Sequence, residues 1–337
     1  MFADNQGSFN INGMWNIKKK VFPKIAQSKP TGKKNIAGQI ITNPDGLKKL
    51  YLETFVHRLR HRPIREDLEE LKSLKESLFQ MRLMLTRKTK SESWNINQLE
   101  KVLSSLKGNK ARDPHGMINE LFKPGVIGQD LKQSLLQLLN GIRYNCFIPD
   151  FVEWANIAAV YKGKGDRLDL DNDRGIFLVT VIRSILMRMM YTDKYEMVDS
   201  SMSDSNVGAR KGMNIRNHIF IINGIINNVL QDKSKAVDVQ ILDYKQCFDS
   251  MWLEDTLNDL CDAGIQDDTL AVLYEANKNV KVAVKTPHGL TERKNVKEII
   301  LQGDVFGPIE CSVSVDTCGK ECTQEDKHMY IYKEEMV

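Results

Sequence analysis

The segment VDVQILDYKQCFD, residues 237–249, constrains the fold more than any other stretch of this sequence. Its alternation of apolar and polar residues predicts a β-strand with Val239, Ile241 and Asp243 on one face. A carboxylate that shares a face with two apolar neighbours is costly to bury unless it is paired or binds a metal. Two interpretations follow from this segment alone: Asp243 caps the turn after the strand, or it belongs to a functional site.

Other segments carry equally regular patterns. Short runs rich in β-branched residues and bounded by polar residues predict strands at 155–161, 237–244 and 279–286. Apolar residues that recur every three or four positions predict helices over 66–88, 96–107 and 130–142. Helices that alternate with short strands predict a fold that mixes α and β structure, either α/β or α+β.

The helix expected over 66–88 has the clearest apolar face. The residues of this face are Leu68, Leu71, Leu74, Leu78, Met81 and Leu85. Acidic residues crowd the start of the segment and basic residues its end, which suits the helix dipole. We expect the face to pack on the core of the chain itself, and a partner helix is the alternative.

The net charge of +4 conceals an uneven distribution. Residues 1–90 hold 19 of the 48 Lys and Arg residues but only 8 of the 44 Asp and Glu residues, so their net charge is +11 and that of the remainder is −7. A basic segment of this kind suits a phosphate-rich partner or is simply a solvated arm. Residues 1–45 show no period and are rich in Lys, Asn, Gly and Pro, which predicts a linker or a partly disordered segment.

Composition also narrows the class of protein. No apolar run reaches the ~18 residues that a membrane span needs, and the N-terminus lacks the basic and apolar regions of a secretory signal. Six scattered cysteines in a chain of 337 residues are typical of reduced intracellular thiols. We therefore expect an intracellular protein, in the cytoplasm or the nucleus, that does not enter a membrane.

Five segments resemble, in the same order, the motifs of reverse transcriptases from non-LTR retrotransposons of the LINE or jockey type. Residues 106–125, LKGNKARDPHGMINELFKPG, resemble the first fingers motif, and residues 157–190 resemble the second. Residues 206–220, NVGARKGMNIRNHIF, resemble the segment before the palm. ILDYKQCFDSMW resembles motif A and LQGDVFGPIECSVSVD resembles motif B with its Gln-Gly-Asp. The resemblance runs from about residue 95 to the end of the chain.

The resemblance implies an α+β right-hand polymerase. Residues 95–235 would form the fingers and residues 236–337 an incomplete ferredoxin-like palm, after a basic linker and amphipathic helix in residues 1–94. The implied activity is RNA-directed DNA synthesis, with RNA template, DNA primer and deoxynucleoside triphosphates as partners. Nucleotidyl transfer of this kind uses two divalent cations, which implies Mg²⁺ as the cofactor.

The metal and sugar contacts carry over to motif A. Asp243 is the implied catalytic carboxylate and Mg²⁺ ligand, and the carbonyl of Tyr244 is the implied second ligand. Phe248 matches the aromatic under the sugar of the incoming nucleotide, although it also suits a core position. Asp249 is interpreted as structural, as a cap for the helix that carries Trp252 and Leu253.

The implied phosphate and template contacts lie in the second fingers motif and motif B. Arg174 matches the arginine of the family's Asn-Tyr-Arg-Pro and is the first choice of triphosphate ligand, with Lys162 and Lys164 beside it. Gln302 and Gly303 would let the backbone approach the template base and the nucleotide closely. The chain departs from the family at two places here, since Asp173 stands for Tyr and Gly175 for Pro.

The second carboxylate motif of the family, Tyr/Phe-x-Asp-Asp, does not follow motif B in this sequence. Asp267-Asp268 lies before motif B and is predicted to begin a helix instead. We therefore expect a truncated reading frame with an incomplete two-metal site, inactive as a polymerase on its own. The rival interpretations are a catalytically inactive nucleic-acid-binding remnant and a fragment that does not fold alone.

Overall fold

The computed structural model describes residues 32–60, 69–231 and 247–325, except for the side chains of residue 60 and residues 321–325. The helices are α2 (Pro44–Arg60), α3 (Glu69–Lys88), α4 (Ile96–Ser105), α5 (Gln129–Asn145), α6 (Val181–Ser201), α7 (Ile215–Gln231), α8 (Cys247–Ser250), α9 (Leu253–Asp262), α10 (Asp268–Lys278) and α11 (Gly307–Glu325). The strands are β1 (Lys33–Lys34), β2 (Ile40–Ile41), β3 (Trp154–Tyr161), β4 (Asp173–Val179), β5 (Asn279–Thr286), β6 (Gly289–Leu290) and β7 (Lys294–Lys297). The predicted mixture of α and β structure is confirmed.

The main sheet has five strands, in the order β4-β3-β5-β6, and β7 pairs with β5 as well. β3 is antiparallel to β4 and parallel to β5, so the sheet is mixed. The strands predicted at 155–161 and 279–286 correspond to β3 and β5 and are confirmed. The strand predicted at 237–244 lies outside the described residues.

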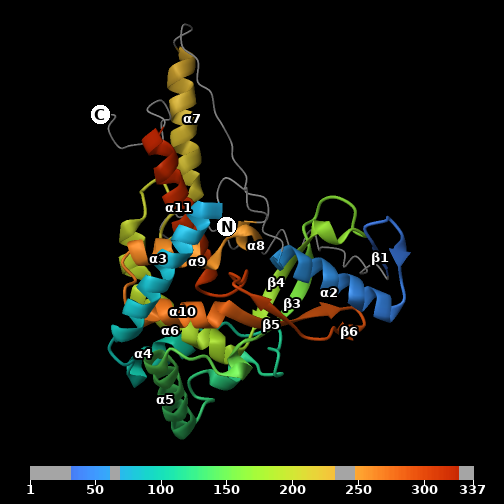
Figure 1. Cartoon of the computed structure of the whole chain (residues 1–337), viewed down its shortest axis with the longest axis horizontal. Helices are drawn as coiled ribbons and strands as arrows, with labels where there is room; N and C mark the ends of the chain where they lie inside the picture. Colours follow the sequence, from blue (N-terminus) through green and yellow to red (C-terminus); the bar gives the residue numbers. More distant parts are fainter. Residues whose placement is uncertain (1–31, 61–68, 232–246, 326–337) are drawn as a thin grey trace, which may run out of the picture.

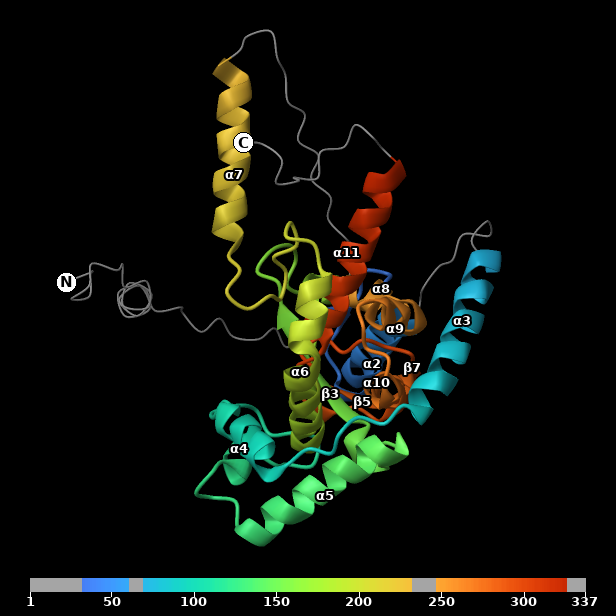
Figure 2. The same ribbon diagram turned by 90° about the vertical axis from the view of Figure 1, so that its left-hand side faces the viewer.

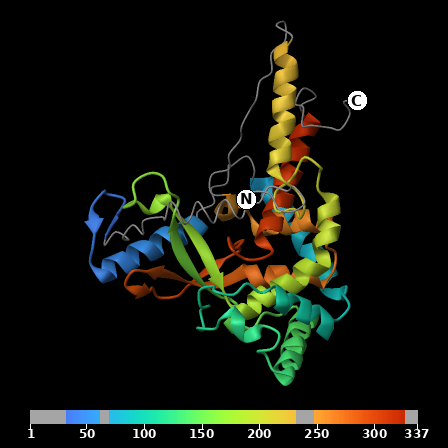
Figure 3. The ribbon, with the colours of Figure 1, turned by 180° about the vertical axis from the view of Figure 1, so that it is seen from behind.

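One face of this sheet is covered by α2 (Figure 1). Tyr51, Phe55 and further apolar residues of α2 form a core with the inward-facing side chains of β3, β4, β5 and β7. β-Branched side chains suit this position because they pack well on a pleated surface. Seen from behind, no described helix lies in front of β3 and β4 (Figure 3), and Val160 and Arg174 are exposed on this side, which we call the open face of the hairpin.

The helices α3 to α6 and α9 to α11 form a second core that extends away from the sheet (Figure 2). α3 contacts α9 and α10, α9 contacts α11, and α4 contacts α5 and α6. The helices predicted over 96–107 and 130–142 are α4 and α5 and are confirmed. α4 begins with a capping box in which Asn95 and Gln98 satisfy each other's backbone N–H groups.

The expected division of the chain at residues 94 and 235 does not separate two cores. The core under the sheet takes side chains from α2, β3, β4 and β5, and the helical core takes them from α3, α4 and α9. Each core therefore contains residues from all three predicted segments. The reason is topological, because β5 pairs with β3 across more than a hundred residues of sequence.

The apolar face expected on α3 does not pack on the core. Leu74 is 70% exposed and Met81 59%, and the rest of the described face is also exposed. The buried side chains of α3 are Phe79, Leu83 and Thr86. Phe79 packs against the ring of Tyr274 in α10, with 5.2 Å between ring centroids. The side of α3 that contacts α9 and α10 is therefore the one that carries Phe79 and Leu83, and the face with the regular leucine spacing is exposed.

The linker expected over residues 1–45 is wrong where the structure describes it. β1 pairs with β2, and the Lys33 ammonium forms a buried ion pair with Asp173 of β4 over 2.6 Å. The helix α2 then begins at Pro44, after Asn43 accepts a hydrogen bond from Gly46 N–H. Residues 33–60 therefore belong to the same unit as the sheet.

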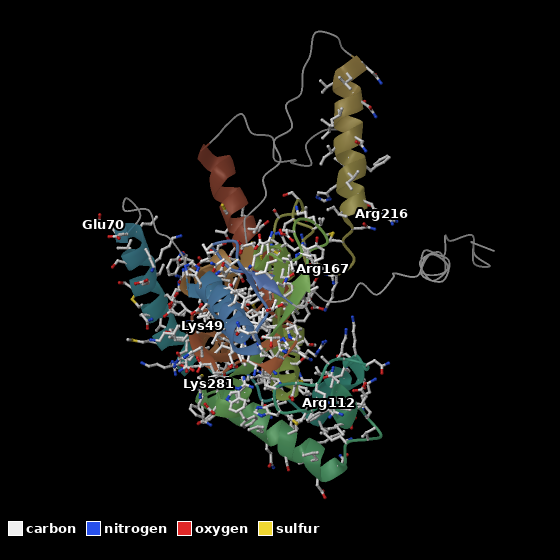
Figure 4. The ribbon with its side chains drawn as sticks, turned by 90° about the vertical axis from the view of Figure 1, so that its right-hand side faces the viewer. Lys49, Glu70, Arg112, Arg167, Arg216 and Lys281 are labelled. Atoms are coloured by element: carbon white, nitrogen blue, oxygen red, sulfur yellow. The ribbon has the colours of Figure 1, made fainter. Side chains whose placement is uncertain are left out.

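α7 stands clear of the body, with Arg216 at its near end and Glu70 on the opposite side of the molecule (Figure 4). Asp249 lies within α8, and the N-cap of α9 is Trp252, which makes no side-chain capping bond; the capping role expected for Asp249 is wrong.

In the parts of the chain that are described, no helix combines the length and apolarity needed to cross a lipid bilayer.

Candidate functional site

The candidate site is built around the junction between β4 and α6. The backbone N–H of Phe177 in β4 donates to the carbonyl oxygen of Gln302 over 2.9 Å. Gly303 follows with φ +114°, and a Cβ at this residue would lie 2.9 Å from the carbonyl oxygen of Phe177. Glycine is required here because any side chain would collide with the strand. The loop of motif B therefore lies directly along β4, and Gly303 is exposed there.

Asp304 holds this loop in place through a buried ion pair with Arg183 of α6. Its carboxylate accepts a hydrogen bond of 2.8 Å from Nε of Arg183, and the two side chains are 4% and 1% exposed. Arg183 also donates to the carbonyl of Ala276 and to the side chain of Asn277 at the end of α10. A buried guanidinium with this many partners holds α6, α10 and the loop in one arrangement.

The first fingers motif reaches the same junction. Asp113 precedes a turn in which Gly116 has φ +83° and donates its N–H to the Asp113 carbonyl over 3.0 Å. The Asp113 carboxylate accepts from the N–H of Val181, the first residue of α6, over 3.0 Å. An acidic side chain at a helix N-terminus is favourable. The Pro-x-Gly turn of the resemblance is therefore attached to the start of α6.

Arg174 lies on the open face of the β3–β4 hairpin. Its neighbours in β4, Asp173 and Gly175, face α2, because Asp173 pairs with Lys33 and a Cβ on Gly175 would lie 3.0 Å from the ring of Phe55. Since side chains alternate along a strand, Arg174 points to the opposite face. It is exposed there, and it makes no ion pair with any residue that the structure describes.

The same contacts account for the two departures from the family pattern. Asp173 is stabilised by Lys33, so a carboxylate is accommodated in a position that is almost fully buried. Gly175 leaves room for the Phe55 ring, which a larger residue would displace. Both departures lie on the covered face and leave Arg174 unobstructed on the other.

Lys162 and Lys164 lie in the loop at the far end of the hairpin. Lys162 is exposed, and its ammonium donates to the carbonyl of Asp171 over 2.8 Å. Lys164 is exposed between Gly163 and Gly165, which have φ +84° and +80°. Both lysines therefore lie at one end of the hairpin, and the Gln302–Gly303 loop contacts the hairpin nearer its other end, at Phe177. Arg174 lies between the lysines and this contact.

The sequence interpretation missed a second basic residue on this face. Lys285 in β5 is in register with Ala158 of β3, and Ala158 is in register with Ile176 of β4. Residues in register point to the same face of a sheet, and Ile176 shares its face with Arg174, so Lys285 lies on the face of Arg174. Lys285 is exposed and forms no ion pair within the described parts of the chain. Alternation in the segment NVKVAVKT was the available signal, because it separates the buried valines from Lys281 and Lys285.

Phe248 lies at the edge of the helical core, close to motif B. It is partly buried and packs against that core, and its ring carbon Cε1 lies 3.6 Å from the position of a Cβ on Gly307. Gly307 begins α11 directly after the loop that contains Gln302. The core interpretation of Phe248 and a contact with a ligand at the loop remain compatible, since part of the side chain is accessible.

The implied metal ligands cannot be placed in the same way. Asp243 and Tyr244 lie outside the described residues, and Mg²⁺ binding therefore stays a prediction. Within the described ranges, no group of three or more His, Cys, Asp or Glu side chains is arranged to hold a metal ion. The described part of the site offers cationic side chains and backbone groups, which suit phosphates and bases.

One acidic residue beneath the loop has an unusual environment. Glu310 is fully buried, and its Oε1 has no hydrogen-bond partner among the described residues. Burial raises the pKa of Glu310 to about 8, and the nearby Asp304 acts in the same direction, whereas Arg183 opposes it. Glu310 is therefore largely protonated at neutral pH, which avoids a second buried negative charge beside Asp304.

The open hairpin face and the loop beside it are the surface with the most features of a ligand site. Four segments far apart in the sequence, which contain Asp113, Arg174, Phe248 and Gln302, converge on it or border it. Comparison of the sequence with models of known protein families gives no match, and comparison with curated proteins gives none either. The functional interpretation therefore depends on these residues and their geometry.

Proposed function

We propose that the chain is the fingers and part of the palm of an RNA-directed DNA polymerase from a non-LTR retrotransposon. The proposal combines the order of the five segments in the sequence with the position of residues from four of them, Asp113, Arg174, Phe248 and Gln302, at or beside the β4–α6 junction. In this assignment β3, β4 and the first helices belong to the fingers, and α8 to α11 belong to the palm side. The intact enzyme would join deoxynucleotides to a primer on an RNA template through two Mg²⁺ ions.

A single observation carries most of this proposal. The strand β4 presents Arg174 on its open face, and three residues further along it bonds to Gln302 through Phe177. The resemblance assigns Arg174 to the triphosphate and Gln302 to the base pair that forms. At about 3.3 Å per residue these two contacts are separated by about 10 Å, a distance that one nucleotide can span.

The proposed roles follow from the chemistry of each group. Arg174 binds the triphosphate with its planar fork of donors, and Lys162 and Lys164 add charge at the end of the hairpin. Gln302 and Gly303 present backbone and amide groups to the template base and nucleotide. Phe248 lies under the sugar, and Asp243 with the Tyr244 carbonyl holds Mg²⁺.

A second function is favoured by the position of the basic residues. Arg174 and Lys285 are on the described surface and do not depend on Asp243. Two metal ions beside a triphosphate need more carboxylates than Asp243 alone. We therefore propose that this 337-residue chain binds RNA or DNA without sequence preference and does not extend a primer, as a nucleic-acid-binding remnant would behave.

Binding and synthesis are tested separately. Fluorescence anisotropy with a labelled RNA–DNA hybrid, between about 50 and 200 mM salt, should give affinity that falls steeply with salt. Arg174→Ala and Lys285→Ala should each weaken binding and reduce the salt slope by roughly 1, as expected for one lost phosphate contact. Lys101→Ala, which removes one exposed charge from α4, is the matched control and should have little effect.

Primer extension on a homopolymer template decides between the two functions. No incorporation together with salt-sensitive binding supports the remnant. Template-dependent incorporation that is lost in Asp243→Asn establishes the polymerase. Binding that is unchanged in both basic variants, or absent at low salt in a folded chain, contradicts the proposed surface.

A further inference from the structure

Two cysteine thiols from distant parts of the sequence lie side by side. Cys247 is the first residue of α8 and Cys311 lies in the second turn of α11, and their Sγ atoms are 3.2 Å apart. Both are free thiols and both are partly exposed. The sulfur atoms need to approach by only ~1 Å to reach the length of a covalent S–S bond, which is about 2.05 Å.

The other described cysteines differ from this pair. Cys146 and Cys261 are buried, and burial raises the pKa of both thiols, so they behave as small core residues. Cys318 is partly exposed and lies seven residues beyond Cys311 in α11. Proximity and accessibility therefore coincide at Cys247 and Cys311.

We propose that Cys247 and Cys311 form a redox-active dithiol that hydroperoxides convert into an intramolecular disulfide. The Cys247 thiolate attacks the terminal oxygen of the hydroperoxide, the O–O bond breaks, and the product is a sulfenic acid on Cys247 with release of hydroxide from hydrogen peroxide or of alkoxide from an organic hydroperoxide. The Cys311 sulfur then attacks the sulfenic sulfur, the S–O bond breaks, and the hydroxyl leaves as water with the thiol proton of Cys311. Two electrons pass from the sulfurs to the peroxide, and a thiol reductant reverses the reaction.

The roles of the two sulfurs differ because one stabilises the other. The hydrogen bond between the two sulfurs lowers the pKa of Cys247 to about 7 and raises the pKa of Cys311. Burial opposes the first shift and adds to the second. Since the thiolate is the nucleophile, Cys247 reacts first with peroxide and Cys311 resolves the intermediate.

The disulfide would tie together the two elements that border the candidate site. Phe248 follows Cys247 directly, and α11 follows the Gln302–Gly303 loop. The bond would close a segment of 64 residues, so it would also restrict the unfolded chain. The inference starts from the sulfur geometry and holds whether or not the chain is a polymerase.

Peptide mapping of the whole purified chain tests the proposal. The reduced protein is treated with hydrogen peroxide in slight excess, alkylated, and digested with trypsin. A linked pair of peptides 246–278 and 298–320 is expected, with fragment ions that place the bond between Cys247 and Cys311. Dithiothreitol should release both peptides. Absence of this link while peroxide oxidises other thiols overturns the proposal.

Each peptide contains a second cysteine, Cys261 in the first and Cys318 in the second, so variants are needed to identify the two cysteines that are bonded. Cys247→Ser and Cys311→Ser should each abolish the link, and Cys261→Ala and Cys318→Ser should retain it. The link should also raise the midpoint of thermal unfolding of the wild-type chain, and Cys247→Ser should show no such rise. A linked pair that persists in Cys247→Ser would assign the bond to another cysteine and contradict the inference.

Discussion

Arg183 donates through Nε to the carboxylate of Asp304 over 2.8 Å, and neither side chain is more than 4% exposed. The bond joins the start of α6 to the loop that lies along β4. Asp304 is the third residue of the Gln-Gly-Asp segment, so its role in this structure is to hold the loop. The two residues before it, Gln302 and Gly303, are thereby left at the surface of the site.

Breaking this pair should strongly destabilise the fold. Arg183→Met leaves Asp304 buried without its cation, which we expect to lower the free energy of unfolding by about 3–5 kcal/mol. Lys49→Ala is the control, because the Lys49–Glu53 pair is 3.9 Å apart and mostly exposed, and its loss should cost less than about 1 kcal/mol. Urea denaturation measures both. Similar losses in the two variants would show that burial does not decide the effect.

Glu310 should make stability depend on pH. Its pKa is about 8 in the folded chain and about 4.5 in the unfolded chain, so the folded state binds more protons between these values. Stability should therefore fall as pH rises through this window, by a few kcal/mol in total at about 1.4 kcal/mol per pKa unit. Glu310→Gln should remove this slope.

The measurement is urea unfolding of wild type and Glu310→Gln from about pH 5 to pH 8. The difference between the two proteins isolates Glu310 from other groups such as Asp259, whose pKa burial also raises, to about 6. The variant should gain stability relative to wild type as pH increases. A difference that does not change with pH would contradict the assigned environment of Glu310.

Shortening a side chain to alanine should lower the free energy of unfolding on one side of α3 and hardly change it on the other. Phe79→Ala removes a fully buried ring that packs on Tyr274, and should lower the free energy of unfolding by about 3–5 kcal/mol. Leu74→Ala changes a side chain that is 70% exposed, and should cost less than about 0.5 kcal/mol. Chemical denaturation of both variants compares them. A larger loss for Leu74→Ala would restore the leucine face as the buried one.

Two adjacent lysines provide a matched test of the packing of the N-terminal segment. Lys33 and Lys34 each lie 2.6 Å from a carboxylate, but the Lys33–Asp173 pair is buried and the Lys34–Asp166 pair is exposed. Lys33→Met should lower the free energy of unfolding by about 3–5 kcal/mol because it leaves Asp173 unpaired. Lys34→Met should change stability little. Equal effects in thermal or urea unfolding would mean that the buried Lys33–Asp173 pair does not hold β1 against β4.

Local sequence predicted those elements whose signals lie within a few residues of one another. The capping box of Asn95 and Gln98 marks the start of α4, and Asp267 accepts a bond from Thr269 at the predicted start of α10. These bonds connect neighbours in the chain, so they form in much the same way whatever the rest of the fold does. The buried valines of β5 follow from alternation for the same reason.

α2 shows that a readable signal can be overlooked. Asn43 and Pro44 are typical of a helix start, and Leu47, Tyr51, Phe55 and Leu59 follow at steps of four. The basic and polar residues around them favoured the interpretation of a linker. Burial against the sheet, and the ion pair of Lys33 with Asp173, decide the outcome for this segment.

The sequence by itself determined the helices α3, α4 and α5, the start of α10, and the strands β3 and β5. It did not determine that Phe79 rather than Leu74 is buried, or that Phe177 bonds to Gln302. Periodicity reports that a helix has an apolar face, but the neighbouring elements choose which face is covered. The contact between β4 and the loop joins residues 125 positions apart, and only the packing of the whole chain brings such residues together.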